Sequence, residues 1–254
     1  MILPSYRAYR VWQRNRDVYF RLWLSETLPM LVEPLFVLVA MGFGLGAYVA
    51  LAGGQSYLEF LAPGLIASYA MFSATFECTY GSYVRMELQK TFDAIIATPL
   101  SIEDVIAGEI LWAGTRSAMT AGAVLVVIAA LGLVGQPWAP LAIVVAGLEG
   151  LMFGSFAMLF TSVTPSINGF SYYFTLFITP MFFAGDIFFP LSGLPEVVQR
   201  IAWFVPLTHM ARLSRGLVNG PMGWDLVWHG AWVLGITAIV FLVSLATMRR
   251  RLIK

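Results

Sequence analysis

The sequence predicts an all-α integral membrane protein with six transmembrane helices, and hydropathy, block length and charge distribution all support this fold class. Hydrophobic residues make up 59% of the 254-residue chain, whose mean hydropathy is +0.79. They form blocks of about 20 residues, the length that a helix needs to cross the hydrocarbon core, where no water satisfies backbone groups. Nine of the fifteen Lys and Arg residues lie at the two ends, Arg7 to Arg21 and Arg249 to Lys254. Cytosolic flanks carry the excess of basic residues, so both ends are expected in the cytosol.

Six apolar blocks have the length of membrane spans, and we place them at 27–52, 58–82, 106–133, 141–163, 169–186 and 228–248. Connections 53–57 and 134–140 contain no Lys or Arg, so the positive-inside rule places them outside. Arg85 and Lys90 lie in 83–105, which is therefore expected in the cytosol. We interpret 1–254 as a single transmembrane domain with no room for a soluble catalytic domain.

The N-terminal segment 1–26 is predicted to be an amphipathic helix that lies along the inner membrane surface. At about 100° per residue, one face carries Arg7, Arg10, Arg14 and Arg21, and the opposite face carries Trp12, Tyr19, Phe20 and Trp23. Arg16 falls among the aromatic residues, so it must extend to the interface or find a partner. The alternative is a basic flank that is helical by chance.

The cytosolic segment 83–105 is predicted to contain a second amphipathic helix, over 86–97. Its apolar side comprises Leu88, Phe92, Ile95 and Ile96, and its polar side comprises Glu87, Lys90, Thr91 and Asp93. Thr98-Pro99 should end this helix, and Ser101 with Asp104 should form a capping box that opens the third span. A helix held between two spans can transmit a push to both. The alternative is a structural elbow.

Segment 187–227 is expected outside the membrane, although it carries Arg200, Arg212 and Arg215. Pro190, Pro195 and Pro206 divide it into pieces too short to cross the bilayer, and Val197, Val198, Ile201, Phe204 and Val205 make one piece amphipathic. Non-spanning helices at membrane depth occur only where they are buried in protein or line a polar cavity. The sequence therefore predicts an external re-entrant helical hairpin within 187–217.

Four ionisable residues, Glu33, Glu77, Arg116 and Glu149, fall within or near the ends of the predicted spans. An unpaired charge there costs about 2.5–3.5 kcal/mol on insertion scales, so each should have a partner. Glu77 and Glu149 are the expected acids for an intramembrane ion pair with Arg116. Such groups either relay ions in a carrier or pair helices structurally, and both interpretations stay open.

The sequence lacks the motifs of an enzyme that acts alone. A P-loop needs a glycine-rich turn that ends in Gly-Lys-Ser/Thr, and neither lysine, Lys90 or Lys254, follows a glycine. His209, His229 and the single Cys78 provide no metal site of ordinary ligand spacing. We therefore expect no catalytic, cofactor-binding or metal-binding residues, and no nucleic-acid partner.

Three stretches resemble the ABC-2 type exporter permease family. RMELQKTFDAIIATPLSIED at 85–104 is similar to the family's cytosolic stretch. FPLSGLPE at 189–196, followed by PLTH and RGLVNG, is similar to its external segment before the last span. EPLF at 33–36, which runs into GFGLG at 42–46, is closer to the branch that includes the nodulation lipo-oligosaccharide exporter permease.

This resemblance implies partners and roles. The helix between the second and third spans would dock on a separate ATP-binding cassette ATPase subunit through Glu87, Leu88, Thr91, Phe92, Asp93 and Ile95. Re-entrant helices would close the outer side, with Pro190, Pro195, Phe204 and Pro206 in the gate. The implied complex is a permease homodimer with two ATPase chains in the bacterial inner (cytoplasmic) membrane, and those ATPase chains would bind ATP and Mg.

The leading hypothesis is the membrane subunit of an ATP-driven exporter that moves a lipid-linked oligosaccharide or a similar amphiphile outward. An ABC-2 exporter of hydrophobic drugs would differ in cargo. An ion-coupled secondary transporter would be expected to have internally repeated halves with ionisable groups at mid-membrane, and no convincing repeat is present. A membrane anchor would not need the coupling helix.

Overall fold

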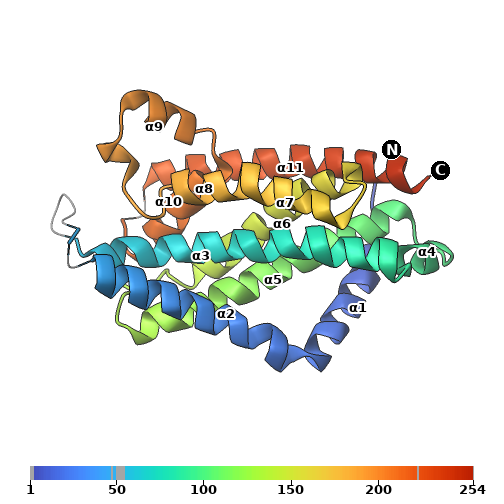
Figure 1. Cartoon of the computed structure of the whole chain (residues 1–254), viewed down its shortest axis with the longest axis horizontal. Helices are drawn as coiled ribbons and strands as arrows, with labels where there is room; N and C mark the ends of the chain where they lie inside the picture. The colour runs from blue at the N-terminus through green and yellow to red at the C-terminus, as the bar shows by residue number, and fades with distance from the viewer. Residues whose placement is uncertain (1–2, 47, 50–54, 222, 254) are drawn as a thin grey trace.

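The structure is a computed structural model that describes residues 3–46, 48–49, 55–221 and 223–253. Over these ranges every regular element is a helix, as predicted. The long helices run side by side along the longest axis of the molecule, and the N- and C-terminal segments lie at the same end (Figure 1). The basic residues of both chain ends therefore gather at this end, which we call the terminal end.

In the described part of the chain, four helices are long and apolar enough to cross a membrane: Trp23–Gly42, Ile102–Ala130, Leu141–Val163 and Trp224–Leu252. The first comprises α2 (Trp23–Val37) and the start of a π-helical segment, η1 (Leu38–Leu45). The others are α5 (Ile102–Ala130), α6 (Leu141–Val163) and α11 (Trp224–Leu252). α6 has the predicted bounds, whereas α5 and α11 begin earlier than predicted and α2 begins inside the predicted interfacial segment 1–26. Residues 47 and 50–52 of the predicted first span lie outside the described residues.

The helix of the second predicted span extends beyond its expected end at residue 82. α3 (Tyr57–Phe76) begins at Ser56, whose hydroxyl accepts the Glu59 N–H while the Glu59 carboxylate accepts the Ser56 N–H. It continues through two π-helical turns, η2 (Glu77–Gly81) and η3 (Val84–Leu88). These turns are wider than α-helical ones and are common at functional sites.

The segment predicted as a span at 169–186 is helical without a break from 167 to 184, although the type of helical turn changes along it. Its parts are η4 (Ile167–Gly169), α7 (Phe170–Tyr173), η5 (Phe174–Ile178) and α8 (Thr179–Ala184). Aromatic stacking holds them on the bundle, because the Phe174 ring lies 4.5 Å from Phe76 and the Tyr173 ring 4.7 Å from Phe160. Stacked rings at these distances stabilise packing beyond simple burial.

Small residues allow α5 and α6 to approach closely at the centre of the bundle. A Cβ added at Gly150 would lie 2.6 Å from Ser117, and one added at Gly154 would lie 3.1 Å from the Ala113 side chain. Small residues at helix contacts are typical of membrane bundles, where close backbone approach replaces the hydrophobic driving force. α6 also packs against α3 and α11, so it forms the core of the molecule.

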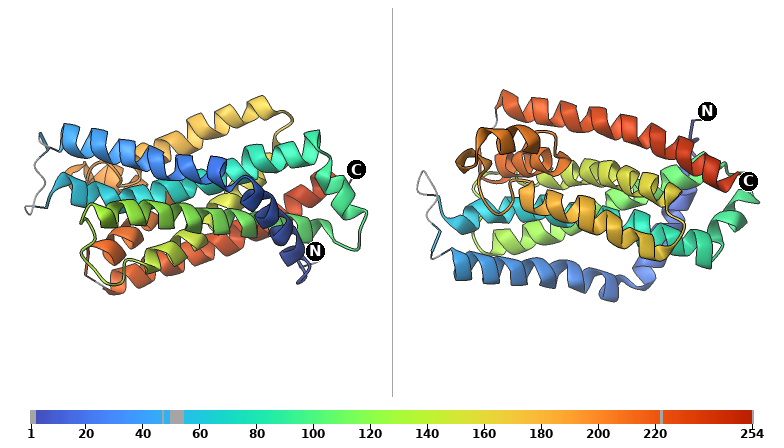
Figure 2. Two further views of the ribbon diagram at one scale, coloured as in Figure 1. Left: turned by 90° about the horizontal axis from the view of Figure 1, so that it is seen from below. Right: turned by 45° about the horizontal axis from the view of Figure 1, so that its top comes forward.

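α1 (Ala8–Arg21) crosses the bundle obliquely at the terminal end (Figures 1 and 2). Its buried face is Ala8, Val11, Asn15 and Tyr19, which packs on α5. The predicted aromatic face is divided: the Trp12 Nε1 donates to Thr115 Oγ1 at 2.8 Å, whereas Phe20 and Trp23 are exposed. The face is divided because the chain turns at Leu22. Trp23 is the first residue of α2, so it does not lie on the same helix as Trp12. Arg16 pairs with Asp17 at 2.7 Å and lies over the Trp12 ring.

Short helices cover both ends of the bundle. α4 (Thr91–Ile96) lies at the terminal end, between α3 and α5. The opposite end carries η6 (Leu191–Gly193), α9 (Glu196–Ala202) and α10 (Pro206–Val218). α9 projects from the bundle, whereas α10 packs against α3, α6 and α11.

Candidate coupling turn and buried charge cluster

The chain turns sharply between α3 and α4 at the terminal end. Lys90 adopts a left-handed conformation, with φ of 54°, and this residue separates η3 from α4. The continuous amphipathic helix predicted over 86–97 is therefore wrong: it is divided at Gln89–Lys90, and α4 covers Thr91–Ile96 alone. The change of direction rotates Leu88 away from the apolar side of α4, so Leu88 is 69% exposed.

We call residues 88–97 the coupling turn. Leu88, Gln89, Lys90, Asp93, Ala94 and Ala97 are exposed there, and Thr91 and Ile95 are partly exposed. Phe92 is fully buried in the hydrophobic core, so it anchors α4 and does not contribute to the exposed surface. As predicted, helix α4 ends before Thr98-Pro99, and Ser101 and Asp104 form a capping box at the start of α5.

An ion pair joins Glu87, the residue before the coupling turn, to the last helix. Arg251 Nη2 donates to Glu87 Oε1 at 3.0 Å, and Lys90 Nζ donates to Glu87 Oε2 at 3.3 Å. Arg251 also donates to the carbonyls of Thr161 and Thr164 at the end of α6. The Arg251 hydrogen bond holds the pKa of Glu87 below its ordinary value, and Lys90 acts in the same direction.

Further contacts tie the chain ends to the start of α5. Arg249 Nη1 donates to Glu103 Oε1 at 2.7 Å, and the Ser5 N–H donates to Asp104 Oδ1 at 2.6 Å. Arg7 donates to the Pro99 carbonyl. Both chain ends are therefore attached to the segment that follows the coupling turn.

A cluster of buried charges lies inside the bundle, beside the η3 segment that leads into the coupling turn. Arg85 Nη2 donates to Glu77 Oε1 at 2.7 Å, and the Arg85 guanidinium also binds Glu109 Oε2. Glu109 accepts from Ser82 Oγ at 2.8 Å and from Asn15 Nδ2 at 2.9 Å, so its buried carboxylate is fully bonded. The cluster thus connects α1, the end of α3 and α5.

Arg116 extends this cluster to α2. Its Nη1 lies 3.1 Å from Glu77 Oε2 and 2.8 Å from Glu26 Oε2. The structure therefore brings together Arg116 and Glu77, two of the three residues predicted to form an intramembrane ion pair. Glu149, the third, is fully buried, and both its carboxylate oxygens lack a hydrogen-bond partner among the described residues. Glu33 is exposed on α2.

Sequence reasoning overlooked Glu109, Glu26 and the burial of Arg85. Glu109 lies inside the predicted third span seven residues before Arg116, which is two helical turns and the same face. The criterion that selected Arg116 thus applied equally to Glu109. Arg85 was assigned to a cytosolic connection, because nothing in the sequence showed that π-helical turns would prolong α3.

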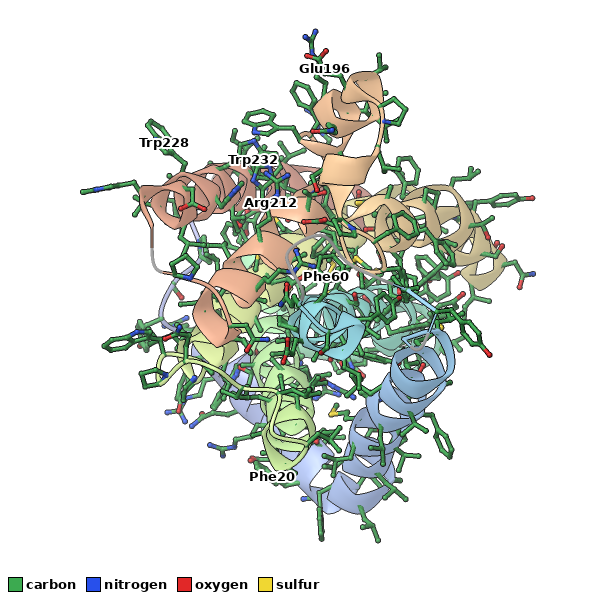
Figure 3. All side chains as sticks on the ribbon, turned by 90° about the vertical axis from the view of Figure 1, so that its left-hand side faces the viewer. Phe20, Phe60, Glu196, Arg212, Trp228 and Trp232 are labelled. Atoms are coloured by element: carbon green, nitrogen blue, oxygen red, sulfur yellow. The ribbon has the colours of Figure 1, made fainter. Side chains whose placement is uncertain are left out.

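At the end opposite the termini, Asp186 fixes the beginning of the 187–227 region. Arg215 of α10 donates from Nη1 to Asp186 Oδ2 at 2.9 Å and from Nη2 to the Asp186 carbonyl at 2.6 Å. The Arg215 guanidinium lies 4.0 Å from the centre of the Phe60 ring. Figure 3 shows this end of the molecule, with Arg212 on α10 and Phe60 on α3.

The four predicted gate residues lie at the boundaries of short elements. Pro190 precedes η6, Pro195 precedes α9 and Pro206 is the first residue of α10. Phe204 is 71% exposed in the connection between α9 and α10. The prolines thus divide this region as predicted. Glu196 lies at the outer edge of α9, where it pairs with Arg200 at 2.6 Å (Figure 3).

The two histidines of the chain meet between α10 and α11. His209 Nδ1 lies 2.6 Å from His229 Nδ1, and His209 Nε2 lies 2.7 Å from the Trp203 carbonyl. The carbonyl accepts, so His209 Nε2 carries a hydrogen, and in the neutral pair His209 Nδ1 accepts from His229. No group of three or more metal-ligating side chains occurs in the part of the chain that the structure describes.

Two adjoining cavities flank the charge cluster. One, of about 400 Å³, lies between α1 and the ends of α3 and α5. The other, of about 600 Å³, lies between α2, α3 and α5. Both are lined by Glu26, Glu77, Gly81 and Arg116, so they adjoin at the charge cluster, and we call the two cavities together the groove.

Helices of membrane-spanning length, a folded turn between two of them and buried ion pairs define a polytopic helical membrane protein. The family model for ABC-2 type transporters matches residues 6–219. Nodulation protein J of Rhizobium leguminosarum bv. trifolii is 40% identical over 246 residues, which cover 96% of this chain and 93% of that protein. Nodulation protein J of Bradyrhizobium diazoefficiens is 34% identical over 255 residues, which cover 100% and 97%. The inner membrane transport permease YadH of Escherichia coli is 23% identical over 211 residues, which cover 79% and 78%.

The chain belongs to the ABC-2 type transporter family. It is the membrane permease subunit of an ABC exporter.

Proposed function

We propose that this permease crosses the membrane six times, with both termini in the cytosol, and that a separate ATP-binding cassette subunit drives it through the coupling turn. The observation that carries this proposal is the turn itself, which presents Leu88, Gln89, Lys90 and Asp93 beside the basic chain ends. The positive-inside rule assigns that end to the cytosol, where ATP is available. α3 and the α7–α8 series supply the two spans beyond the four long apolar helices.

The ATPase subunit would bind ATP and Mg, and the permease would contribute no catalytic group. The coupling contacts on this chain would be Glu87, Leu88, Thr91, Asp93 and Ile95, with Phe92 anchoring α4 beneath them. A homodimer with two ATPase chains is the simplest arrangement for one kind of permease chain, because C2 symmetry closes the complex.

The proposed cargo is a lipid-linked oligosaccharide or a similar amphiphile that moves from the inner leaflet outward. The support is the relation to nodulation protein J at 34–40% identity over nearly the full length, together with the motifs of the lipo-oligosaccharide branch. α9 and α10 would form the external re-entrant region that closes the path, with Pro190, Pro195, Phe204 and Pro206 at its hinges.

Charge reversal at the coupling turn tests this function. The permease and its ATPase subunit are reconstituted in liposomes, and ATP hydrolysis and lipid export are measured together. Asp93→Lys combined with Leu88→Asp should reduce export per ATP at least about tenfold, because both residues are exposed and neither supports the core. Glu196→Lys, an equally exposed acid at the opposite end, is the matched control.

Two results would contradict the proposal: hydrolysis of ATP by the purified permease alone, or full coupling in the Asp93→Lys and Leu88→Asp variant. The native melting temperature of the variant shows that the membrane domain remains folded.

A further inference from the structure

The groove beside the charge cluster has a polar lining and an exposed edge on α2. Its lining along α3, η2 and η3 extends from Tyr69 to Arg85, a length of up to about 24 Å at the α-helical rise of about 1.5 Å per residue. On α2 its edge is formed by Ser25, Pro29 and Glu33, which are all exposed. The groove therefore begins at α1, near the proposed inner surface, and continues toward the membrane centre.

The charges that line the groove balance. Glu26 and Glu33 on α2 and Glu77 on η2 line it, and Arg14, Arg85 and Arg116 contribute the same number of positive charges. Arg116 Nε is buried and has no hydrogen-bond partner among the described residues, so a donor remains unused in the wall. Polar groups at membrane depth persist only beside polar partners or water. The groove thus requires a polar occupant.

The lining favours sugars over a charged headgroup. A site with equal acids and bases offers neighbouring donors and acceptors but no net charge to attract an anion or a cation. Six aromatic side chains also line the two cavities, among them Tyr69, Phe76 and Trp112. Aromatic faces suit the apolar faces of sugar rings, while paired carboxylates and guanidinium groups match their hydroxyls.

An apolar strip lies next to the groove opening. Leu24, Leu28, Val32 and Phe36 on α2 are all exposed. Such a strip suits acyl chains that remain in the bilayer while the headgroup occupies the polar groove. We propose that this groove binds the uncharged oligosaccharide head of an amphiphile, with the acyl chains lying in the lipid along α2. This inference rests on the proposed export function and assigns its cargo site on this chain.

Photolabelling of the purified permease in nanodiscs, without the ATPase, tests the site. The probe is a glycolipid with a neutral tetrasaccharide head and a photoreactive group beside the sugar, and phosphatidylglycerol with the same photoreactive group is the comparison lipid. The glycolipid should label peptides from α2 and α3. Ser25→Trp, which fills the groove opening, should lower labelling at least about tenfold. Val144→Trp, at an exposed position of α6 that lines neither cavity, should leave labelling within about twofold.

Equal or stronger labelling by phosphatidylglycerol would overturn the inference, as would unchanged labelling in Ser25→Trp. Free tetrasaccharide at the same concentration should compete weakly, and complete competition by it would show that the site binds soluble sugar instead. If Ser25→Cys cross-links efficiently between two copies and no glycolipid labels the groove, a second copy covers it and the inference fails. Labelling that persists while ATP-driven export is absent would refute the export function alone.

Discussion

At the scale of single residues, the two arginines of the buried cluster have different surroundings. Arg85 binds Glu77 and Glu109, both well buried, whereas Arg116 binds Glu77 and the partly exposed Glu26. A buried charge that loses its partner is strongly destabilising, although a complete pair contributes little compared with apolar packing. Each arginine is therefore needed for stability chiefly because it neutralises the acids that are already buried beside it.

Removing Arg116 should destabilise the protein through Glu77. Arg116→Met is expected to cost about 3 kcal/mol, because it leaves the three acids of the cluster near a single remaining arginine, Arg85. Adding Glu77→Gln should recover at least about 1 kcal/mol, since the neutral amide needs no cation. Thermal unfolding of detergent-solubilised protein measures both effects. Glu149→Gln serves as the control, and recovery by it would contradict the pairing seen here.

Acidification should loosen the His209–His229 contact. Burial is the main cause that lowers the pKa of His209 from its ordinary value of 6.5, and the nearby His229 and Arg212 add repulsion, whereas the Trp203 carbonyl opposes the shift. Asp225 on α11 attracts a protonated His229. A lowered folded pKa means that the stabilisation is complete above about pH 6.5 and is lost as the pH falls through the folded value.

The measurement is the melting temperature between about pH 8 and pH 5. The native chain should lose stability over this range, and His229→Phe should show a smaller loss because the facing imidazole is absent. An identical slope in both proteins would show that the histidine pair does not cause the pH dependence.

At the scale of helical elements, local sequence patterns predicted where helices begin and end better than they predicted where the chain changes direction. The Ser101–Asp104 capping box and the prolines of the 187–227 region act through neighbouring residues, so the sequence contains the information directly. The π-helical turn η2 packs on α6 and α5, and α4 packs on α5, and no local sequence pattern reports these contacts. The Arg85–Glu109 pair depends on the π-helical turns η2 and η3, and for that reason it could not be predicted.

The left-handed Lys90 gives a direct test of the coupling turn. Lys90→Gly should stabilise the protein by up to about 1 kcal/mol, because glycine adopts positive φ without strain. Lys90→Val should destabilise it by about 1 kcal/mol or more, since a β-branched side chain disfavours this conformation. The two variants are compared by thermal unfolding. If Lys90→Val were as stable as Lys90→Gly, residue 90 would not be left-handed, and a continuous helix over 86–97 would describe the segment better.

At the scale of the whole molecule, the termini, the coupling turn and α6 form one connected unit at the terminal end. Arg251 contacts Glu87 and the last carbonyls of α6, and Arg249 contacts Glu103 at the start of α5. If an ATPase subunit moves the coupling turn, we expect these contacts to pass the movement to α6 and α11 as well as to α3 and α5. The helical class and the family motifs were predictable from sequence, whereas these long-range contacts required the packed structure.

Arg251 should therefore be a positioning residue for coupling. Arg251→Met removes the Glu87 contact and leaves the carbonyls of Thr161 and Thr164 without this donor, so the proposed ATPase would still bind but would move α6 and α11 less effectively. Export per ATP should fall at least about threefold while ATPase binding remains within about twofold. Arg250→Met, the exposed neighbour, is the matched control.

The Arg251 hydrogen bond also lowers the pKa of Glu87, so Glu87 stays charged at a pH where a free glutamate is already protonated. The native complex should therefore keep its coupling as the pH falls until Glu87 protonates, below its ordinary pKa. In Arg251→Met, coupling should be low at every pH. Equal export per ATP in the Arg251→Met and Arg250→Met proteins would show that force reaches the membrane helices only through α3 and α5.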